Sequence, residues 1–161
     1  MFCLSFHHFD DVTARKALKS TLETSDAFAI VELQDRRVGS ILLMFLEFWL
    51  LMLVTVFWFW RDRMQLFWTY CVPVLPAIHG FDGVVSCLRT RDFGEVMELV
   101  EDVLGVSRGA RALKGNGITV RRGEWVFTYQ RTLHTWPVGY MSVITGRKAD
   151  GSGRSFGVAQ G

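Results

Sequence analysis

Two adjacent histidines near the first residues of the chain have side chains that could bind a substrate or move a proton. His7 and His8 directly follow the apolar run of residues 2–6, which predicts a short buried strand. Glu32 stands near the end of a second apolar run, residues 27–33, whose β-branched members are typical of a strand buried on both faces. Ligands of open parallel sheets bind at the carboxyl ends of the strands. We therefore expect His7, His8 and Glu32 to face a substrate pocket, with plain packing as the alternative for the two histidines.

Four further polar residues lie along the sequence IHGFDGVVSCLRTR, at residues 78–91. They are spaced three or four apart, which places them on one face of a helix: His79, Asp82, Ser86 and Arg89. This face has two interpretations. It could hold a buried contact between Asp82 and Arg89 that stabilises a helical hairpin, or it could form the polar wall of a substrate pocket.

The sequence contains no complete catalytic or metal-binding motif. No Cys, Asp or Glu cluster completes a ligand set around the two histidines, so no metal site is predicted. The motifs G-x-S-x-G and H-E-x-x-H and a phosphate-binding glycine loop are absent. The glycines of SRGARALKGNG, residues 107–117, are too irregular for such a loop and predict a plain connection. The residue types therefore indicate candidate pocket residues, but they do not indicate a reaction.

The strongest structural feature is the apolar stretch of residues 41–60, in which only Glu47 and Thr55 are not apolar. A helix of this length measures roughly 30 Å at about 1.5 Å per residue, which matches the hydrocarbon thickness of a bilayer. A charge on Glu47 would cost roughly 2.5–3.5 kcal/mol near the bilayer centre on insertion scales. The stretch predicts membrane contact, while a buried core helix or an apolar lid over a pocket remains open.

The other segments predict an α/β chain with a hydrophobic insertion. Apolar residues at helical spacing predict amphipathic helices at 12–24 and 92–105, the second with Glu95, Glu98, Glu101 and Asp102 on its wet face. Pro73 and Pro76 break the apolar residues 64–88 into two helical pieces. Residues 125–133 and 138–145 predict an antiparallel hairpin. The expected organisation is a βαβ unit at 1–35, a helical insertion at 36–91, a helix plus hairpin at 92–147, and a disordered tail at 148–161.

Composition limits the partners. A net charge of +2 without a basic stripe excludes nucleic acid as an expected partner. Three widely spaced cysteines and the lack of a secretory signal favour a reducing compartment, so we expect an intracellular, membrane-associated protein.

Four stretches of the sequence resemble an uncharacterised family of class I S-adenosylmethionine-dependent methyltransferase-like proteins that has a hydrophobic insertion. FCLSFHHFDD matches the fourth strand of that fold and AFAIVELQDR the fifth. FWTYCVPVLPAIHGFDGVVSCLRTR matches the long hydrophobic pair, and HTWPVGYMSVITGRK the final hairpin. The resemblance covers residues 2–148, nearly the whole chain.

This resemblance implies a partial Rossmann-like sheet, strands four to seven, with an inserted hydrophobic helical hairpin. In the family the first half of the sheet holds S-adenosylmethionine through a glycine-rich loop and an acidic residue, and this sequence contains neither. We therefore expect S-adenosylmethionine to bind only an intact, longer parent and not this chain alone. His7, His8 and Glu32 fall on the substrate side of such a fold.

Two functions follow as hypotheses. The chain would be the substrate-side portion of a methyltransferase-like protein that acts on a lipophilic substrate at a membrane. Alternatively, it would be a non-catalytic membrane-associated or partner-binding protein without the cofactor half. The second predicts self-association, because a sheet that lacks strands has an open edge.

Overall fold

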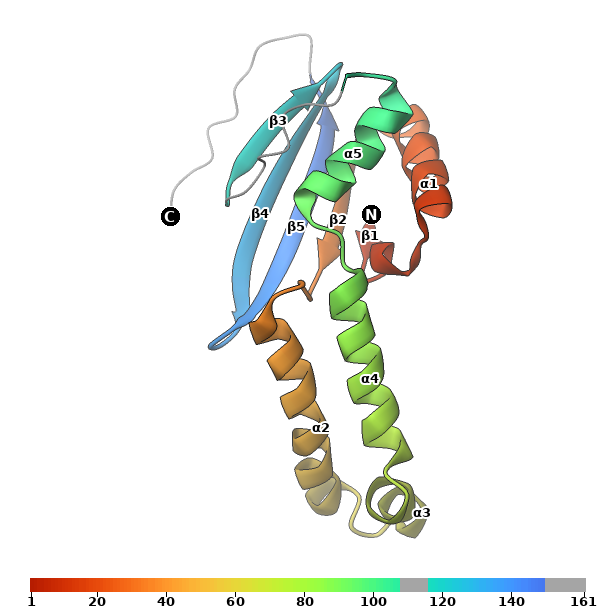
Figure 1. Cartoon of the computed structure of the whole chain (residues 1–161), viewed down its shortest axis with the longest axis vertical. Coiled ribbons are helices and arrows are strands. Elements are labelled where there is room, and N and C mark those ends of the chain that lie inside the picture. The colour runs from red at the N-terminus through yellow and green to blue at the C-terminus, as the bar shows by residue number, and fades with distance from the viewer. Residues whose placement is uncertain (108–115, 150–161) are drawn as a thin grey trace.

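The computed structural model describes residues 1–107 and 116–149, and a five-stranded mixed sheet forms the base of the fold within them (Figure 1). The strand order is β1-β2-β5-β4-β3. The short β1 (Phe2–Cys3) pairs in parallel with β2 (Ala27–Glu32), as the expected βαβ unit requires. The strands β3 (Ile118–Arg122), β4 (Trp125–Thr135) and β5 (Gly139–Lys148) are antiparallel, and β5 pairs antiparallel with β2. The predicted antiparallel hairpin is therefore confirmed as β4 and β5.

The first strand is shorter than predicted, because the chain turns away from the sheet before Phe6. Leu4 has a φ of 51°, in the left-handed region that a leucine seldom occupies. A single turn of 3₁₀-helix, η1 (Phe6–His8), follows it. The prediction of a strand over residues 2–6 was therefore wrong after Cys3, and the two histidines lie on this turn.

Two amphipathic helices pack on one face of the sheet (Figure 1). The helix α1 (Asp11–Thr24) begins where the Asp10 carboxylate accepts a hydrogen bond from the Thr13 amide. The helix α5 (Phe93–Leu104) begins with a capping box between Asp92 and Glu95, in which each side chain accepts from the other's amide. Gly105, with a φ of 65°, ends α5 as predicted, because a glycine adopts this left-handed conformation without strain.

The buried core lies between these helices and the sheet. Its largest fully buried side chains include Trp125 and Phe127 of β4, against Leu18 of α1 and Met97 of α5. Burying one large apolar side chain contributes about 1.5–3 kcal/mol, so this layer holds the α/β part together.

Glu101 does not lie on the wet face of α5 as predicted. Its side chain is 4% exposed, and the Arg122 Nε donates to its Oε1 at 2.6 Å. Arg122 belongs to β3, a strand that the sequence reasoning missed altogether. The ion pair brings the Glu101 carboxylate against the sheet because β3 extends that sheet beyond the predicted hairpin.

A helical hairpin projects from the sheet between β2 and α5 (Figure 1). It consists of α2 (Val38–Trp58), the short α3 (Arg63–Leu66), a π-helical turn η2 (Phe67–Cys71) and α4 (Val74–Arg89). The pieces on either side of Pro73 are bent by 62°, so the predicted break is confirmed. The Tyr70 hydroxyl donates to the Met52 carbonyl and ties the returning chain to α2.

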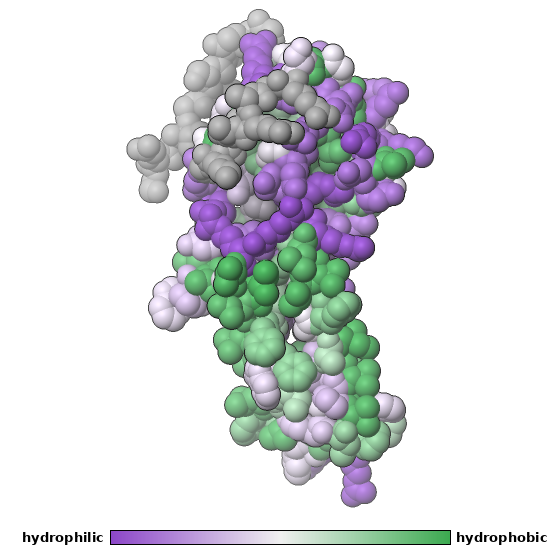
Figure 2. Space-filling view, viewed as in Figure 1, coloured by the Kyte–Doolittle hydropathy of each residue, from purple (hydrophilic) through white to green (hydrophobic). Residues whose placement is uncertain are grey.

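The hairpin and the sheet differ sharply in surface character. Figure 2 shows a hydrophilic α/β part above a hairpin covered with hydrophobic side chains, with a hydrophilic band at the border. Phe45, Leu46 and Leu53 on α2 are 61%, 61% and 62% exposed. The α2 helix is long and apolar enough to cross a membrane, and only 11% of its most apolar window is buried. By length and composition alone, a soluble core helix would pass the same test.

Two predicted segments fall partly or wholly outside the described residues. The loop predicted at residues 107–117 includes 108–115, and the predicted tail includes 150–161. The first residue assigned to that tail, Lys148, is instead the last residue of β5.

Candidate functional site

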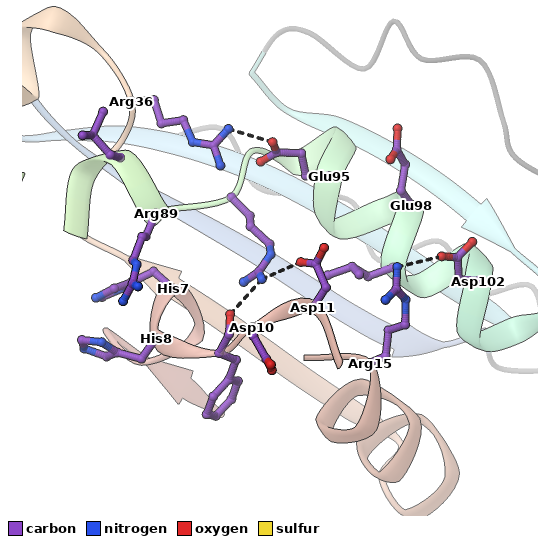
Figure 3. Close-up of a pocket in the computed structure, with 14 residues that line it drawn as sticks. His7, His8, Asp10, Asp11, Arg15, Arg36, Arg89, Glu95, Glu98 and Asp102 are labelled. Atoms are coloured by element: carbon purple, nitrogen blue, oxygen red, sulfur yellow. Dashed lines mark hydrogen bonds and ion pairs between the residues drawn. The ribbon is translucent and has the colours of Figure 1, made fainter. Parts of the chain in front are cut away.

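A polar pocket of about 570 Å³ lies where the turn after β1 meets α1, α5 and the base of α4 (Figure 3). Three of the predicted site residues, His7, His8 and Arg89, line it. Glu32 lies beneath the turn and Asp82 lines a different hollow. The fold therefore brings together three of the five candidates, from segments more than 80 positions apart in the sequence.

Glu32 is a buried anchor for the histidine turn. Its Oε1 accepts the Phe6 amide at 3.0 Å and the His7 amide at 3.3 Å, and its Oε2 lies 2.8 Å from the His7 Nδ1. The Glu32 and His7 side chains are 6% and 5% exposed. A carboxylate with three donors is well compensated for its burial. Glu32 therefore orients the His7 ring and the turn, and it reaches the pocket only through them.

Arg91 closes the wall of the pocket below α1. Its guanidinium donates to the carbonyls of Phe6 and Phe9 at 3.2 and 2.8 Å, and to the Asp11 carboxylate at 2.8 Å. The Arg91 side chain is 12% exposed, so its bonds to the two carbonyls are partly shielded from water, whereas the Asp11 side chain is 65% exposed. Arg91 thus holds the histidine turn from the α5 side as Glu32 holds it from the sheet side.

Two other arginines of the pocket also have acidic partners on α5. Arg36 pairs with Glu95 at 2.7 Å, and Arg15 pairs with Asp102 at 3.3 Å (Figure 3). Both pairs are substantially exposed, and such pairs contribute about 0–1 kcal/mol. The two pairs link α5 to the hairpin base and to α1, and their residues line the pocket.

Arg89 has a different environment. Arg89 lines the pocket together with His7 and His8, whose ring centroids lie 4.2 Å apart (Figure 3). Among the residues that the structure describes, no carboxylate forms an ion pair with Arg89. This end of the pocket, next to the hairpin, therefore offers one guanidinium and the exposed His8 ring to a ligand. Such a set suits an anionic or hydrogen-bond-accepting group.

The acid at the start of α1 has a perturbed pKa. Hydrogen bonds from the side chain and amide of Thr13 hold the pKa of Asp10 below its ordinary value of 3.8. Asp10 lines the pocket rim as an ionised cap, and its carboxylate serves the helix terminus.

A second hollow of about 640 Å³ lies between α2, α4 and the tip of the β4–β5 hairpin. Asp82 lines this groove together with His79 and Glu47, and the His79 Nε2 lies 3.1 Å from the Glu47 Oε1. The predicted polar face of α4 is thus divided, since Asp82 and His79 line the groove while Arg89 lines the polar pocket. Asp82 and Arg89 are both exposed and form no ion pair with one another, so the predicted Asp82–Arg89 contact is absent.

Sequence reasoning missed several residues of the polar pocket. Arg91, Asp11 and Arg36 were not predicted, because their partners lie 59 to 80 positions away and no local pattern reports such contacts. It also considered Glu47 and His79 separately and did not predict their pairing.

Within 1–107 and 116–149, no three His, Cys, Asp or Glu side chains form a group that could hold a metal ion. The loops that follow the parallel strands β1 and β2, residues 4–10 and 33–37, contain no glycine. A phosphate- or methionine-cradling turn needs glycine for close backbone approach. These loops do not fit S-adenosylmethionine, so no chemical step is derived through it.

Comparisons with known proteins give no family. No protein-family model matches the chain, and neither curated protein sequences nor solved structures gave a significant match.

Proposed function

We propose that this chain is the substrate-side portion of a membrane-associated, methyltransferase-like protein whose substrate is lipophilic. The observation that carries the proposal is the position of the polar pocket directly beside the base of an exposed apolar hairpin. The parallel β1–β2 pair followed by an antiparallel hairpin supports the resemblance to strands four to seven of that fold. The pocket residues His7 and His8 follow β1, at the end of a strand, where open sheets bind ligands.

The hairpin supports membrane association in three ways. The α2 helix has 21 residues, and at about 1.5 Å per residue this length matches the hydrocarbon thickness. Trp58 and Trp60 at its far end are 78% and 64% exposed, as interfacial aromatic residues are. Arg61 and Arg63 follow at the tip of the hairpin. Exposed apolar surface of this extent is otherwise an aggregation hazard in water.

Vesicle flotation tests this association on the full chain. We expect the chain to float with neutral phosphatidylcholine vesicles and to remain bound at high salt, because apolar contact is not screened. Phe45→Lys with Val56→Lys places two charges on the apolar face of α2 outside the groove, and a charge near the middle of the helix, as at Phe45, costs about 2.5–3.5 kcal/mol on insertion scales. That variant should remain unbound. Val12→Lys with Ser20→Lys on α1 is the matched control, and it should float normally.

The catalytic part of the proposal is tested in a parent that carries the cofactor half. There, His8→Ala should lower the rate of methyl transfer to a lipophilic acceptor without lowering the unfolding midpoint, because His8 is exposed in the pocket. An unchanged rate would remove His8 from the argument.

One observation favours a second function, the binding of a partner or of another copy. Among the described strands β1 lies at the edge of the sheet and pairs on one side only, with β2. Such an edge can accept another strand. Light scattering in a mild detergent should then show assembly, and Cys3→Lys, a charge at this exposed edge, should shift it toward monomers. Monomers at all concentrations would contradict this second function.

A further inference from the structure

The groove between α2 and α4 contains a close Glu–His contact in the middle of an otherwise apolar hairpin. Glu47 of α2 and His79 of α4 meet at 3.1 Å, and their side chains remain 38% and 56% exposed within it. Glu47 is nine residues from the start of α2, which is about 14 Å along the helix at about 1.5 Å per residue. If the hairpin enters a bilayer, this depth is near the centre. Ionisable groups at that depth are costly and usually serve a function.

The helices α2 and α4 approach each other closely where Gly83 faces Met44. A Cβ added at Gly83 of α4 would lie 2.7 Å from the Met44 sulfur of α2, so the Met44 side chain would have to shift to admit it. Asp82 lies beside Gly83 on α4 and lines the same groove as Glu47. The groove has a volume of about 640 Å³, which is in the range of ligand sites.

The groove has two chemically distinct parts. Leu46, Leu50 and Leu53 supply an apolar wall along α2, and Glu47 and Asp82 supply two carboxylates. No lysine or arginine is among the described residues that line the groove. The imidazole of His79 is thus the near partner of Glu47, and Asp82 has no ion-pair partner within residues 1–107 and 116–149. A carboxylate in an apolar setting attracts a cation far more strongly than it does in water.

We propose that this groove binds a long-chain primary amine, with the ammonium at Glu47 and Asp82 and the alkyl chain along the leucines. The proposal rests on the proposed membrane association, because the ligand would reach the groove from the bilayer. The polar end of the groove is also lined by Leu33 and Gln34, which directly follow β2. The groove therefore reaches from the carboxyl end of that strand along the hairpin to the two carboxylates.

The test uses the full chain in phosphatidylcholine nanodiscs and a long-chain primary amine with a photoreactive diazirine in mid-chain. We expect saturable labelling of α2 near Leu46, Leu50 and Leu53, mapped by mass spectrometry. Unlabelled amine should compete at least about tenfold better than the alcohol or carboxylate of equal length, because a charge-assisted hydrogen bond contributes about 1.5–3 kcal/mol. Equal competition by the alcohol would overturn the charge argument.

Variants distinguish specific binding of the amine in the groove from its general partitioning into the bilayer. Glu47→Gln with Asp82→Asn should lower the apparent affinity at least about tenfold, while Glu23→Gln on the exposed face of α1 should leave it unchanged. Leu50→Trp fills the groove without changing a charge and should also abolish saturable labelling, which covers the case in which the double variant fails to fold. Labelling that persists in Leu50→Trp would overturn the proposal.

Two outcomes distinguish failure of the amine site from failure of the membrane association. A chain that floats with vesicles but is labelled without saturation refutes the amine site and leaves membrane association standing. A chain that does not float refutes both.

Discussion

Removing the Glu32 carboxylate should destabilise the α/β part more than any single surface change. In Glu32→Ala the amides of Phe6 and His7 and the His7 ring lose their acceptor while they remain buried. A buried donor left without its acceptor costs about 1–3 kcal/mol, so the loss of three such bonds should cost at least about 3 kcal/mol. Since domains of this size are stable by about 5–15 kcal/mol, this loss is about a fifth of the total or more.

Glu32→Gln separates charge from shape. Its amide oxygen can still accept from the two backbone amides, so only the charge-assisted contact with His7 is lost. We expect a cost of about 1–2 kcal/mol for this variant. Glu23→Ala, on the exposed surface of α1, serves as the control and should change stability by less than about 0.5 kcal/mol.

The assay is urea unfolding of the full chain in a mild detergent, followed by circular dichroism and tryptophan fluorescence. The free energy of unfolding should fall in the order wild type, Glu32→Gln, Glu32→Ala, with slopes that stay the same. A loss of less than about 1 kcal/mol in Glu32→Ala would refute the view that Glu32 anchors the histidine turn.

Three further predictions concern the helices. The pKa of Asp10 is depressed in the folded chain, so the stability that its carboxylate contributes is present above pH 3.8 and is lost as the pH falls through the folded pKa. The urea midpoint of Asp10→Asn should therefore fall less than that of wild type between pH 5 and pH 2. Parallel falls in the two proteins would contradict this. Gly80→Ala should raise the thermal midpoint of the hairpin, because its Cβ would meet nothing nearer than 3.6 Å, whereas Gly83→Ala should lower it by displacing Met44; equal shifts would refute the close approach at Gly83. Asp92→Ala breaks the capping box and should cost about 1 kcal/mol in unfolding free energy, and no change in the urea midpoint would show that the cap contributes nothing.

Local patterns were sufficient for most of the elements. The helical spacing of apolar residues and the cap residues Asp92 and Gly105 predicted α5 nearly to its ends. The proline break in the hairpin was predicted from Pro73, because the effect of proline on a helix is local. The methyltransferase-like reading of this order of elements and the membrane role of the hairpin stay proposals.

The errors arose where distant contacts override local pattern. The sequence around Phe6 predicts a strand, yet the Phe6 amide donates a hydrogen bond to the Glu32 carboxylate, 26 positions away, instead of to a neighbouring strand. The strand β3 has the sequence ITVRR, and its two arginines do not fit the apolar pattern of a strand. The pairing of Arg122 with Glu101 accounts for one of them, but that partner cannot be inferred from the sequence. The polar pocket likewise depends on pairs such as Arg91 with Asp11, which no spacing rule reveals.

The depth of the hairpin in a bilayer tests the central claim most directly. Nitroxide labels would be attached at Phe45 on α2 and at Val12 on α1, one at a time, in a chain whose three cysteines are replaced. In phosphatidylcholine vesicles we expect the Phe45 label to relax with oxygen and to be shielded from a water-soluble nickel complex, and the Val12 label to show the reverse. Equal access of the nickel complex to both labels would show that the hairpin stays in water, and the membrane account would be wrong.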